Sequence, residues 1–451
     1  MAVTAVVAVD FGASSIRVCR VDLGERPPAL RVVHRHMHGP VADPAGVLRW
    51  DWPRLVAEME KGLAAALEAG PAASIGVDTW GVDYGLLDGR RELVAPPVSY
   101  RDGRTGRYEA VVTRLGGAEA LYRTTGVQLQ PFNTVFQVAA HDADELARAR
   151  HLLMLPELLV HHLTGEIVGE RTSAGTTGLV DIASGDWSAP LVAAIGLDAS
   201  VLPPLLPAGT RVGTWQGVPV HLVGGHDTAS AVVAMGAAPG PGSAFVSTGT
   251  WLLVGREQAG PDLSDRARRA NFSNEIGALG GVRLLKNLAG SWLVERCRAA
   301  WADAVGPGGS VGELLAAAEA AEPPPAQLDV ADQRFLNPTD MLAEVTAALG
   351  LPVDAQPRVV VRGIVESQAA VTAAVLGELG GVTDVHVIGG VAQAGLYARL
   401  LAEQARLPVH AGPVEATALG NALVQGVALG VYADLADARR HLAGDPAEEA
   451  S

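Results

Sequence analysis

The stretch "GGHDTASAV", residues 224–232, delivers a histidine, an aspartate and a threonine directly after two glycines. Small residues then continue as a helix, so the Asp227 carboxylate is placed at a strand-to-helix turn where it can face a cleft. There a carboxylate can accept a proton from a substrate hydroxyl during phosphoryl transfer. The same Asp-Thr pair also occurs as a simple helix cap, and both interpretations stay open.

A second candidate site is "DFGASSIR", residues 10–17. Gly12 lets the backbone approach a ligand closely, Ser14 adds a hydroxyl donor and Arg17 offers a cationic fork, which together suit a phosphate group. Asp10 ends the preceding strand and could hold a magnesium ion through water. The loop is not a Walker motif, because no GK[ST] ends it, and an ordinary glycine hairpin is the alternative.

Three further motifs carry weaker signals. "GVDTWGVDYG", residues 76–85, packs two aspartates around a tryptophan, which can offer a sugar an apolar face and hydrogen bonds, or can be a buried strand end. "STGTW", residues 247–251, mirrors the first loop. "KNLAGSW", residues 286–292, is expected to start a helix that carries Asn287. The neighbouring His161 and His162 have no metal-ligand spacing and are interpreted as structural.

These motifs need an α/β framework to position them. Residues 6–23 and 243–257 each show strand character, a glycine-containing turn and a second strand, which suggests an internal duplication with a nucleotide between the halves. The glycine- and proline-rich segment "AAPGPG", residues 237–242, favours a domain boundary. We therefore expect three segments along the chain: residues 1–236 as the N-terminal domain, 237–435 as the C-terminal domain and 436–451 as a tail.

Other segments have clearer periodicity. Residues 54–70 and 413–430 are expected to be helices, and residues 73–88 return to strand character. Residues 146–166 are expected to be mostly helical with a break or kink at Pro156. "DVHVIGGVAQAG", residues 384–395, indicates a buried strand that runs through a double glycine into a helix.

Composition narrows the class of protein. A chain of 451 residues with 49% hydrophobic and 18% charged residues can bury the cores of two domains. Its net charge of −15 argues against nucleic acid or an anionic membrane as the main partner. We expect a cytoplasmic protein, because no uncharged apolar stretch reaches the roughly 18 residues of a membrane-spanning helix and the start lacks a basic n-region. Cys19 and Cys297 are expected to be buried, without a disulfide.

Taken together, the motifs resemble the FGGY family of carbohydrate kinases, and within it the kinases that act on L-rhamnulose. The resemblance runs from about residue 5 to about residue 430 and rests on the order and spacing of eight motifs. They are "AVDFGASSIR", "GVDTWGVDYGLLD", "YRDGRT", "GVQLQPFNTVFQ", "GHDTASAV", "STGTWLLVG", "NEIGALGGVRLLKNLAGSWL" and "AGPVEATALGN".

The resemblance implies two actin-like, ribonuclease H-like domains with ATP and a sugar in the cleft, and magnesium bound with the ATP. It implies that Asp227 takes the proton from the C1 hydroxyl of the sugar. The sugar contacts carried over are Gly81, His226, Asp227, Thr228 and Asn287. The ATP contacts carried over are Ala13, Ser14, Ser15, Ile16, Arg17, Thr250, Glu295, Gly389 and Gly390.

Three departures from the family pattern lie on the nucleotide side. Ile16 replaces the last glycine of the phosphate hairpin, Glu295 replaces a glutamine, and Val391 and Ala394 alter the adenosine loop. A carboxylate cannot donate the hydrogen bond of a glutamine amide unless it is protonated, and it adds negative charge near an anion. We therefore expect weaker and less selective ATP binding, with an ordinary affinity for the sugar.

The expected activity is ATP-dependent phosphorylation of L-rhamnulose at O1. A kinase for another ketose, such as L-fuculose, is the nearest alternative, since a pocket separates sugars that differ at one centre only modestly. A non-catalytic actin-like nucleotide-binding regulator is the alternative from another class. It would lack the base, whereas Asp227 is present, and a DNA-reading helix pair has no room before Val6.

Overall fold

The computed structural model describes residues 4–236, 242–305, 310–336, 338–390 and 395–442. The chain divides into two compact α/β units, and its two main sheets have six strands each. Unit 1 comprises Met1–Ala238, Glu257–Leu284 and Ala416–Ser451. Unit 2 comprises Pro239–Arg256 and Leu285–Glu415. The expected boundary at residues 237–242 falls almost wholly outside the described residues.

The sheet of unit 1 has the strand order β13-β14-β6-β1-β2-β3. Its strands are β1 Ala5–Gly12, β2 Ser15–Asp22, β3 Ala29–Met37, β6 Ile75–Thr79, β13 Arg211–Trp215 and β14 Val218–His226. β1 and β2 form the expected hairpin, because Gly12 pairs with Ser15 across a two-residue turn. β1 is parallel to β6, and β6 is parallel to β14. The side chains of Val6, Val7 and Val9 are fully buried, so β1 is the centre of the core.

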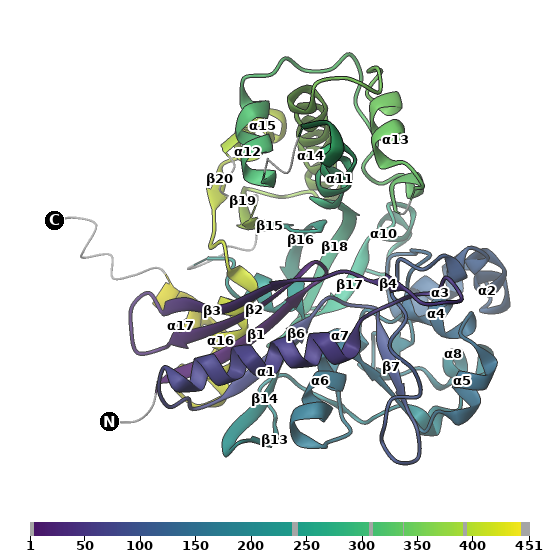
Figure 1. The fold of residues 1–451 in the computed structure, drawn as a ribbon, viewed down its shortest axis with the longest axis vertical. Helices are drawn as coiled ribbons and strands as arrows, with labels where there is room; N and C mark the ends of the chain where they lie inside the picture. The colour runs from purple at the N-terminus through teal and green to yellow at the C-terminus, as the bar shows by residue number, and fades with distance from the viewer. Residues whose placement is uncertain (1–3, 237–241, 306–309, 337, 391–394, 443–451) are drawn as a thin grey trace. The chain divides into compact units, whose positions relative to one another are not determined.

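Two helices cover opposite faces of this sheet, as Figure 1 shows for α1, Trp52–Glu68, and α16, Ala416–Ala428. On the α1 side an added Cβ on Gly62 would meet the side chain of Val18. On the α16 side an added Cβ on Gly426 would meet Leu23.

α1 forms because its sequence supplies both a start and an apolar stripe. The Asp51 side chain accepts a hydrogen bond from the Arg54 amide, and a proline occupies the first turn. Leu55, Met59 and Leu63 recur at the four-residue spacing of one helix face and are buried. The helix predicted over residues 54–70 is therefore confirmed.

A second lobe of unit 1 lies around the antiparallel pair β7, Tyr84–Leu87, and β8, His151–Met154. Its core is made of residues from these strands and from the short helices and loops around them. The helices of this core are α2 Tyr108–Arg114, α3 Ala118–Thr125, α4 Thr134–Ala139, α5 Ala143–Arg148 and α8 Ala189–Ala194, with the turn η2 Ala199–Val201. Two neighbouring elements are the turn η1 Gly103–Thr105, which contacts α4, and α6 Leu155–Thr164, which packs against strands of the sheet.

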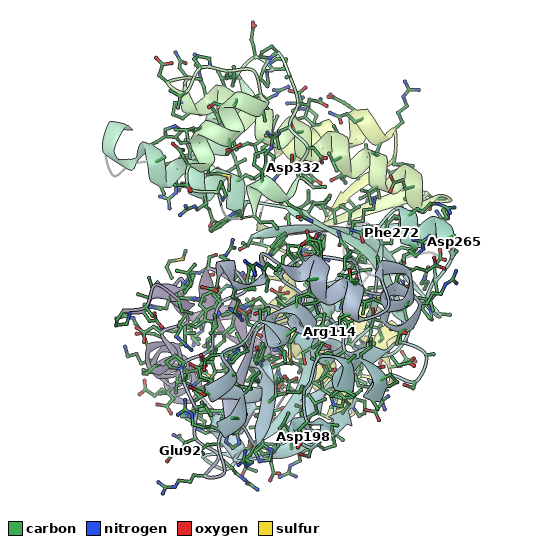
Figure 2. All side chains as sticks on the ribbon, turned by 90° about the vertical axis from the view of Figure 1, so that its right-hand side faces the viewer. Glu92, Arg114, Asp198, Asp265, Phe272 and Asp332 are labelled. Carbon is green, nitrogen blue, oxygen red and sulfur yellow. The ribbon has the colours of Figure 1, made fainter. Side chains whose placement is uncertain are left out.

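The remaining elements of unit 1 are short, apart from its last helix. The segment Glu257–Leu284 contributes a buried Phe272 next to the exposed Asp265 of α10, both labelled in Figure 2. The elements are β4 Val41–Ala42, β5 Leu48–Arg49, β9 Gly169–Glu170, α7 Arg171–Ala174, β10 Val180–Asp181, β11 Asp186–Trp187, β12 Leu205–Leu206, α9 Asp227–Val233, α10 Asp265–Arg269, β17 Ser273–Ile276 and α17 Leu435–Leu442.

The second sheet has the order β17-β18-β16-β15-β19-β20. Its strands beyond β17 are β15 Ser243–Thr248, β16 Trp251–Gln258, β18 Val282–Ala289, β19 Asp384–Gly389 and β20 Val409–Ala411. The β15–β16 hairpin is antiparallel, and β15 is parallel to β19, as β1 is antiparallel to β2 and parallel to β6. This shared order bears out the duplication that the two strand-turn-strand segments indicated.

The helices of unit 2 include one long apolar helix, α14. They are α11 Trp292–Val305, α12 Val311–Glu319, α13 Met341–Ala348, α14 Pro357–Leu379 and α15 Gly395–Ala405, with the turn η3 Gln333–Phe335. By length and composition alone α14 could cross a membrane, with a mean hydropathy of 1.5. Since 61% of that stretch is buried within the fold, the helix has the character of a core helix.

One local prediction was right in part and another was wrong. Residues 146–166 are mostly helical with a break, as expected, but the break includes a strand, β8 His151–Met154, and Pro156 lies in the first turn of α6. Proline suits that position, where the missing amide hydrogen costs nothing. The prediction that "KNLAGSW" starts a helix at Asn287 was wrong, since this residue lies within strand β18 and α11 begins at Trp292.

The close approach of α9 and α16 depends on Gly420, and this generates a prediction. An added Cβ at this position would lie 1.8 Å from the carbonyl oxygen of Ser230, so Gly420→Ala must push the two helices apart. We expect a loss of unit 1 stability of about 1–3 kcal/mol, the usual range for overpacking. Chemical denaturation followed by a probe in unit 1 measures it.

Gly377→Ala is the matched control. Gly377 lies in α14, and an added Cβ there would meet nothing within 4 Å. Alanine in an open helical position is expected to stabilise by about 0.5–1 kcal/mol. Equal effects of the two substitutions would contradict the role of Gly420 in this contact.

Candidate active site

The candidate carboxylates of unit 1 meet at one edge of its sheet. β1, β6 and β14 are parallel, so their carboxyl ends lie side by side. In this register Asp10 of β1 faces Asp78 of β6, and Thr79 faces His226 at the end of β14. Asp227 follows directly as the first residue of α9. The edge therefore gathers acidic side chains from segments that are 68 and 149 residues apart along the chain.

Asp10 and Asp78 are both fully buried, and each has a compensating partner. Arg17 forms an ion pair with Asp10, with 2.9 Å between Nη2 and Oδ2. Asn421 of α16 donates from Nδ2 to Oδ2 of Asp78 at 2.6 Å. Burial raises the pKa of Asp78 well above its ordinary value, the negative charge of Asp10 adds to the rise, and the Asn421 hydrogen bond opposes it.

Asp227 keeps a partly accessible carboxylate, with 26% of its side chain exposed. Oδ1 accepts hydrogen bonds from the Thr228 amide at 2.6 Å and from the Thr228 hydroxyl at 3.1 Å. His226 Nε2 is 3.4 Å from the same oxygen. The hydrogen bonds and the ion-pair contact that the described residues make with this carboxylate go to Oδ1. The cap of α9 is His226 rather than Asp227, and Asp227 Oδ2 is the oxygen that a ligand could use.

His226 connects Asp227 to a buried ion pair. Its Nδ1 lies 3.4 Å from Oε2 of Glu275, which is itself 3.2 Å from Nη2 of Arg283. Burial acts to raise the pKa of Glu275, but the His226 hydrogen bond and the charge of Arg283 outweigh it and hold this pKa at about 2. Glu275 and Arg283 lie within the motif "NEIGALGGVRLLKNLAGSWL", but the sequence analysis did not single them out, because the contact between Glu275 and His226 joins segments that are distant in the chain.

The other sugar-side candidates of unit 1 also gather around His226. An added Cβ on Gly81 would lie 3.3 Å from the His226 ring and 3.1 Å from the Thr176 hydroxyl, so glycine keeps this position open. Thr228 is almost fully buried, and its hydroxyl donates to Asp227. Gly81, His226, Asp227 and Thr228 are therefore one cluster. Asn287 lies on β18, in unit 2.

The tryptophan and aspartate of "GVDTWGVDYG" are used inside the protein. Asp83 is fully buried and accepts indole hydrogen bonds from Trp80 at 3.0 Å and from Trp50 at 2.7 Å. The two rings pack with centroids 4.4 Å apart, and Trp80 is only 4% exposed. The buried-strand alternative therefore describes these side chains better than a sugar-stacking surface does.

The phosphate hairpin is held by His38, a residue that the sequence did not single out. Its Nε2 donates to the Gly12 carbonyl at 3.0 Å, and its amide donates to the Ser14 carbonyl at 3.0 Å. Burial lowers the pKa of His38 to about 4, so the ring is neutral at pH 7. The ring also packs beside Trp80, at 5.5 Å between centroids. A histidine before a glycine-proline pair is too common a pattern to have identified it.

The five hairpin candidates differ in what they can offer a ligand. Ser14, Ser15 and Arg17 are half-buried, whereas Ala13 is 7% exposed. Ile16 is fully buried, so its side chain faces the core and only its backbone can contribute at the turn. The departure from glycine at this position therefore does not obstruct the loop.

The nucleotide-side candidates of unit 2 form their own cluster. The amide of Ser291 donates to the Gly249 carbonyl at 2.8 Å and that of Gly290 to the Thr250 carbonyl at 3.2 Å, so the start of α11 is tied to the β15–β16 turn. Glu295 lies one turn into α11, where Oε1 accepts from the Ser291 hydroxyl at 3.2 Å. An acidic side chain in a first helical turn is favoured by the helix dipole.

Gly389 joins this cluster through β15. Its φ is +96°, and an added Cβ would lie 2.2 Å from the Thr248 carbonyl oxygen, so only glycine fits. Gly390 is exposed, and Val391 and Ala394 lie outside the described residues. A largely apolar pocket lies beside the cluster, within unit 2. It is lined by Thr248, Gly249, Leu252, Gly290, Ser291, Val294, Val311, Leu315, Val365, Gln368 and Tyr397.

The donors at the sheet edge fit a magnesium ion that arrives with phosphate. Asp10 and Asp78 supply carboxylate oxygens, which Mg²⁺ prefers, and such an ion needs only one or two protein ligands beside water and phosphate. Within the described part of the chain, no group of three or more histidine, cysteine, aspartate or glutamate side chains could hold a metal. The arrangement thus fits an ion shared with a nucleotide rather than a dedicated protein cage.

Comparison with known proteins matches both halves of the chain. Residues 5–235 match the N-terminal domain, and residues 244–429 the C-terminal domain, of the FGGY family of carbohydrate kinases. A rhamnulokinase from Enterococcus faecalis (strain ATCC 700802 / V583) is 37% identical, over 96% of this chain and 91% of the relative.

Solved structures share the fold at low sequence identity. A xylulose kinase from Lactobacillus acidophilus has a TM-score of 0.78 and 14% identity, covering 99% of this chain and 95% of that one. A Plasmodium falciparum glycerol kinase, solved with ADP, has a TM-score of 0.74 and 14% identity, covering 98% and 93%.

The buried Glu275–Arg283 pair generates a prediction about pH. Because the pKa of Glu275 is lowered from its ordinary 4.5 to about 2, its charge stabilises the fold fully above pH 4.5, and this contribution is lost as the pH falls towards 2. Glu275→Gln leaves Arg283 buried and unpaired, so at pH 7 we expect a loss of about 3–5 kcal/mol. The difference between wild type and variant should shrink below pH 4.5 in denaturant titrations.

Glu60→Gln is the control for this measurement. Glu60 pairs with His162 at 2.9 Å, but its side chain is 48% exposed, so the change is expected to cost less than about 1 kcal/mol. A difference between wild type and Glu275→Gln that stayed constant from pH 7 to pH 3 would contradict the assignment of the lowered pKa.

Proposed function

This chain belongs to the FGGY family of carbohydrate kinases, and we propose that the sugar it phosphorylates is L-rhamnulose, at the O1 hydroxyl. The enzyme is an ATP-dependent sugar phosphotransferase, as the family is. The observation that carries the choice of sugar is the 37% identity to a rhamnulokinase over 96% of the chain. The xylulose and glycerol kinases of similar fold are too distant in sequence, at 14% identity, to favour their own substrates here.

The proposed proton acceptor is Asp227. Its Oδ1 is held by the amide and hydroxyl of Thr228, which leaves Oδ2 to receive the proton of the O1 hydroxyl. Gly81 and His226 lie beside it and are the proposed contacts to the sugar in unit 1, and Asn287 is proposed as a contact from unit 2. The base thus orients the hydroxyl and removes its proton as the phosphoryl group is transferred.

The proposed phosphate contacts are the backbone amides of Ala13 to Ile16 and the hydroxyl groups of Ser14 and Ser15. Arg17 adds a positive charge that is shared with Asp10. Asp10 and Asp78 would hold Mg²⁺, which would neutralise charge on the transferred phosphoryl group. In unit 2 the Thr250, Glu295, Gly389 and Gly390 cluster, with the pocket beside it, is the proposed site for the nucleoside. The weaker ATP binding expected from Glu295 stays a prediction.

A coupled assay of ADP release tests the sugar. With ATP and Mg²⁺ present, L-rhamnulose is expected to give the highest kcat/KM in a panel with L-fuculose, D-xylulose and glycerol, and the product should carry phosphate on C1 by NMR. Discrimination against L-fuculose is expected to be at least about 10-fold, the scale that one displaced contact gives. Equal ADP release with and without sugar would point to an ATPase, and a preference for another ketose would replace L-rhamnulose.

Asp227→Asn tests the base. The amide keeps the shape of the side chain but cannot accept the proton, so kcat is expected to fall by about 10² to 10⁴, while the Kd for L-rhamnulose stays within a few-fold of wild type. Calorimetry of sugar binding beside the turnover assay separates the two. A purified variant with wild-type turnover would mean that Asp227 only serves the end of α9.

A further inference from the structure

We infer that Thr172 and Glu170 are positioning residues for the Asp227 base, because they hold the backbone of the two residues that precede it. The inference rests on the proposed role of Asp227. Glu170 ends β9 and Thr172 lies in α7, more than 50 residues before the turn that they contact. None of the motifs that identify the family includes either residue.

The need for such support arises from an irregularity in β14. The parallel pairing of β14 with β6 shifts register between Leu222 and His226, so the regular ladder is interrupted just before the base. Such a bulge redirects the chain and leaves backbone amides without their ladder partners. The segment is buried, and a buried amide without an acceptor is costly.

Glu170 and Thr172 provide the acceptors. The Gly225 amide donates to Oε2 of Glu170 at 3.0 Å, and the His226 amide donates to the hydroxyl oxygen of Thr172 at 3.2 Å. The Thr172 hydroxyl in turn donates to Glu170 Oε2 at 2.5 Å, so the two contacts form one unit. A carboxylate oxygen that accepts several amides makes strong, directional hydrogen bonds. The backbone that leads into Asp227 is therefore fixed from outside its own strand.

The fit around Gly225 is close. An added Cβ there would lie 3.0 Å from Glu170 Oε2, 3.3 Å from Pro156 Cγ and 3.4 Å from Glu157 Oε1. A side chain at this position would have to displace the carboxylate that accepts the Gly225 amide. The second glycine of "GGHD" is thus explained by the approach of Glu170 rather than by a turn.

A second buried carboxyl group supports the first. Oε1 of Glu157 accepts hydrogen bonds from the Glu170 amide at 3.0 Å and from the Ser173 hydroxyl at 2.5 Å. Burial raises the pKa of Glu157 to about 8; the Ser173 hydrogen bond opposes the rise and the charge of Glu170 adds to it. Glu157, Glu170 and Thr172 are each at most 1% exposed, so we place them behind the turn as positioning residues rather than in contact with substrate.

Thr172→Val tests the inference, because valine keeps the shape and removes the hydroxyl group. We expect kcat for L-rhamnulose to fall about 10- to 100-fold, the effect of a small misplacement of a catalytic group, while the KM for ATP changes less than about twofold. Thr172→Ser restores the hydroxyl and should return kcat to within about threefold of wild type. Hydrogen exchange of a peptide that covers the Gly225 and His226 amides should be faster in Thr172→Val only.

Thr125→Val is the matched control. Thr125 is also buried in unit 1, and its hydroxyl accepts the Val127 amide at 3.2 Å and donates to the Leu121 carbonyl at 2.9 Å. It has the same kind of hydrogen bonds as Thr172 but no contact with the base-bearing turn. We expect the kcat of Thr125→Val to stay within about twofold of wild type, even if its melting temperature falls as much as that of Thr172→Val. Equal losses of kcat in the two valine variants would overturn the inference.

Glu170→Gln covers the case in which Thr172→Val does not fold. The glutamine has the same shape but no charge to strengthen the hydrogen bonds, so kcat should fall about 10-fold with the KM for ATP preserved.

Asp227→Asn separates the proposed role of the base from the proposed role of the positioning residues. If Asp227→Asn is inactive while Thr172→Val or Glu170→Gln has wild-type kcat, the base stands and the positioning role falls. If Asp227→Asn retains wild-type turnover, both fall.

Discussion

Burial of negative charge at the edge of an apolar sheet is the constraint on which unit 1 depends. Asp10 and Asp78 are fully buried, and a carboxylate in such a place is tolerated only with hydrogen bonds or an opposite charge. Each buried acid accordingly has its own partner: Arg17 for Asp10, Asn421 for Asp78, and Arg283 for Glu275. Strand β2, helix α16 and strand β18 place these three partners beside the acids.

The parallel β1, β6 and β14 strands bring the acids to one place, and segments that follow these strands in the chain supply several of their partners. α16 inserts an asparagine beneath Asp78, and the β17–β18 segment contributes the Glu275 and Arg283 pair behind His226. The Asp227 carboxylate is the exception, since it remains about one quarter exposed. The neighbouring carboxylates are buried, whereas this one is partly exposed. A proton acceptor needs an accessible oxygen, because a carboxylate whose oxygens all accept hydrogen bonds from the protein has no place for a substrate hydroxyl.

The sequence allowed prediction of what depends on neighbouring residues. The two strand-turn-strand segments, the α1 helix and the position of Asp227 at the start of α9 all follow from local periodicity and glycine placement. Local patterns failed where a short apolar run had to be assigned: His151–Met154 is a strand because it pairs with β7, and Asn287 is in a strand because β18 continues past it. Partners such as Asn421, Arg283 and Glu170 were out of reach, because their role exists only once distant segments meet.

The position of α16 in the chain has a consequence for synthesis on the ribosome. Asn421 contacts Asp78 across 343 residues, and Gly420 lies against Ser230, so one face of the first sheet is covered by a helix that is translated long after its strands. While the chain emerges, the acids of β1 and β6 have no amide from α16, and the apolar face that α16 covers is open to solvent or chaperone. Unit 1 therefore cannot finish folding before unit 2 is synthesised, as the first domain of a simple tandem protein can. The segment that forms unit 2 emerges before α16 covers the N-terminal sheet. The folding of the two halves of the duplication is therefore coupled.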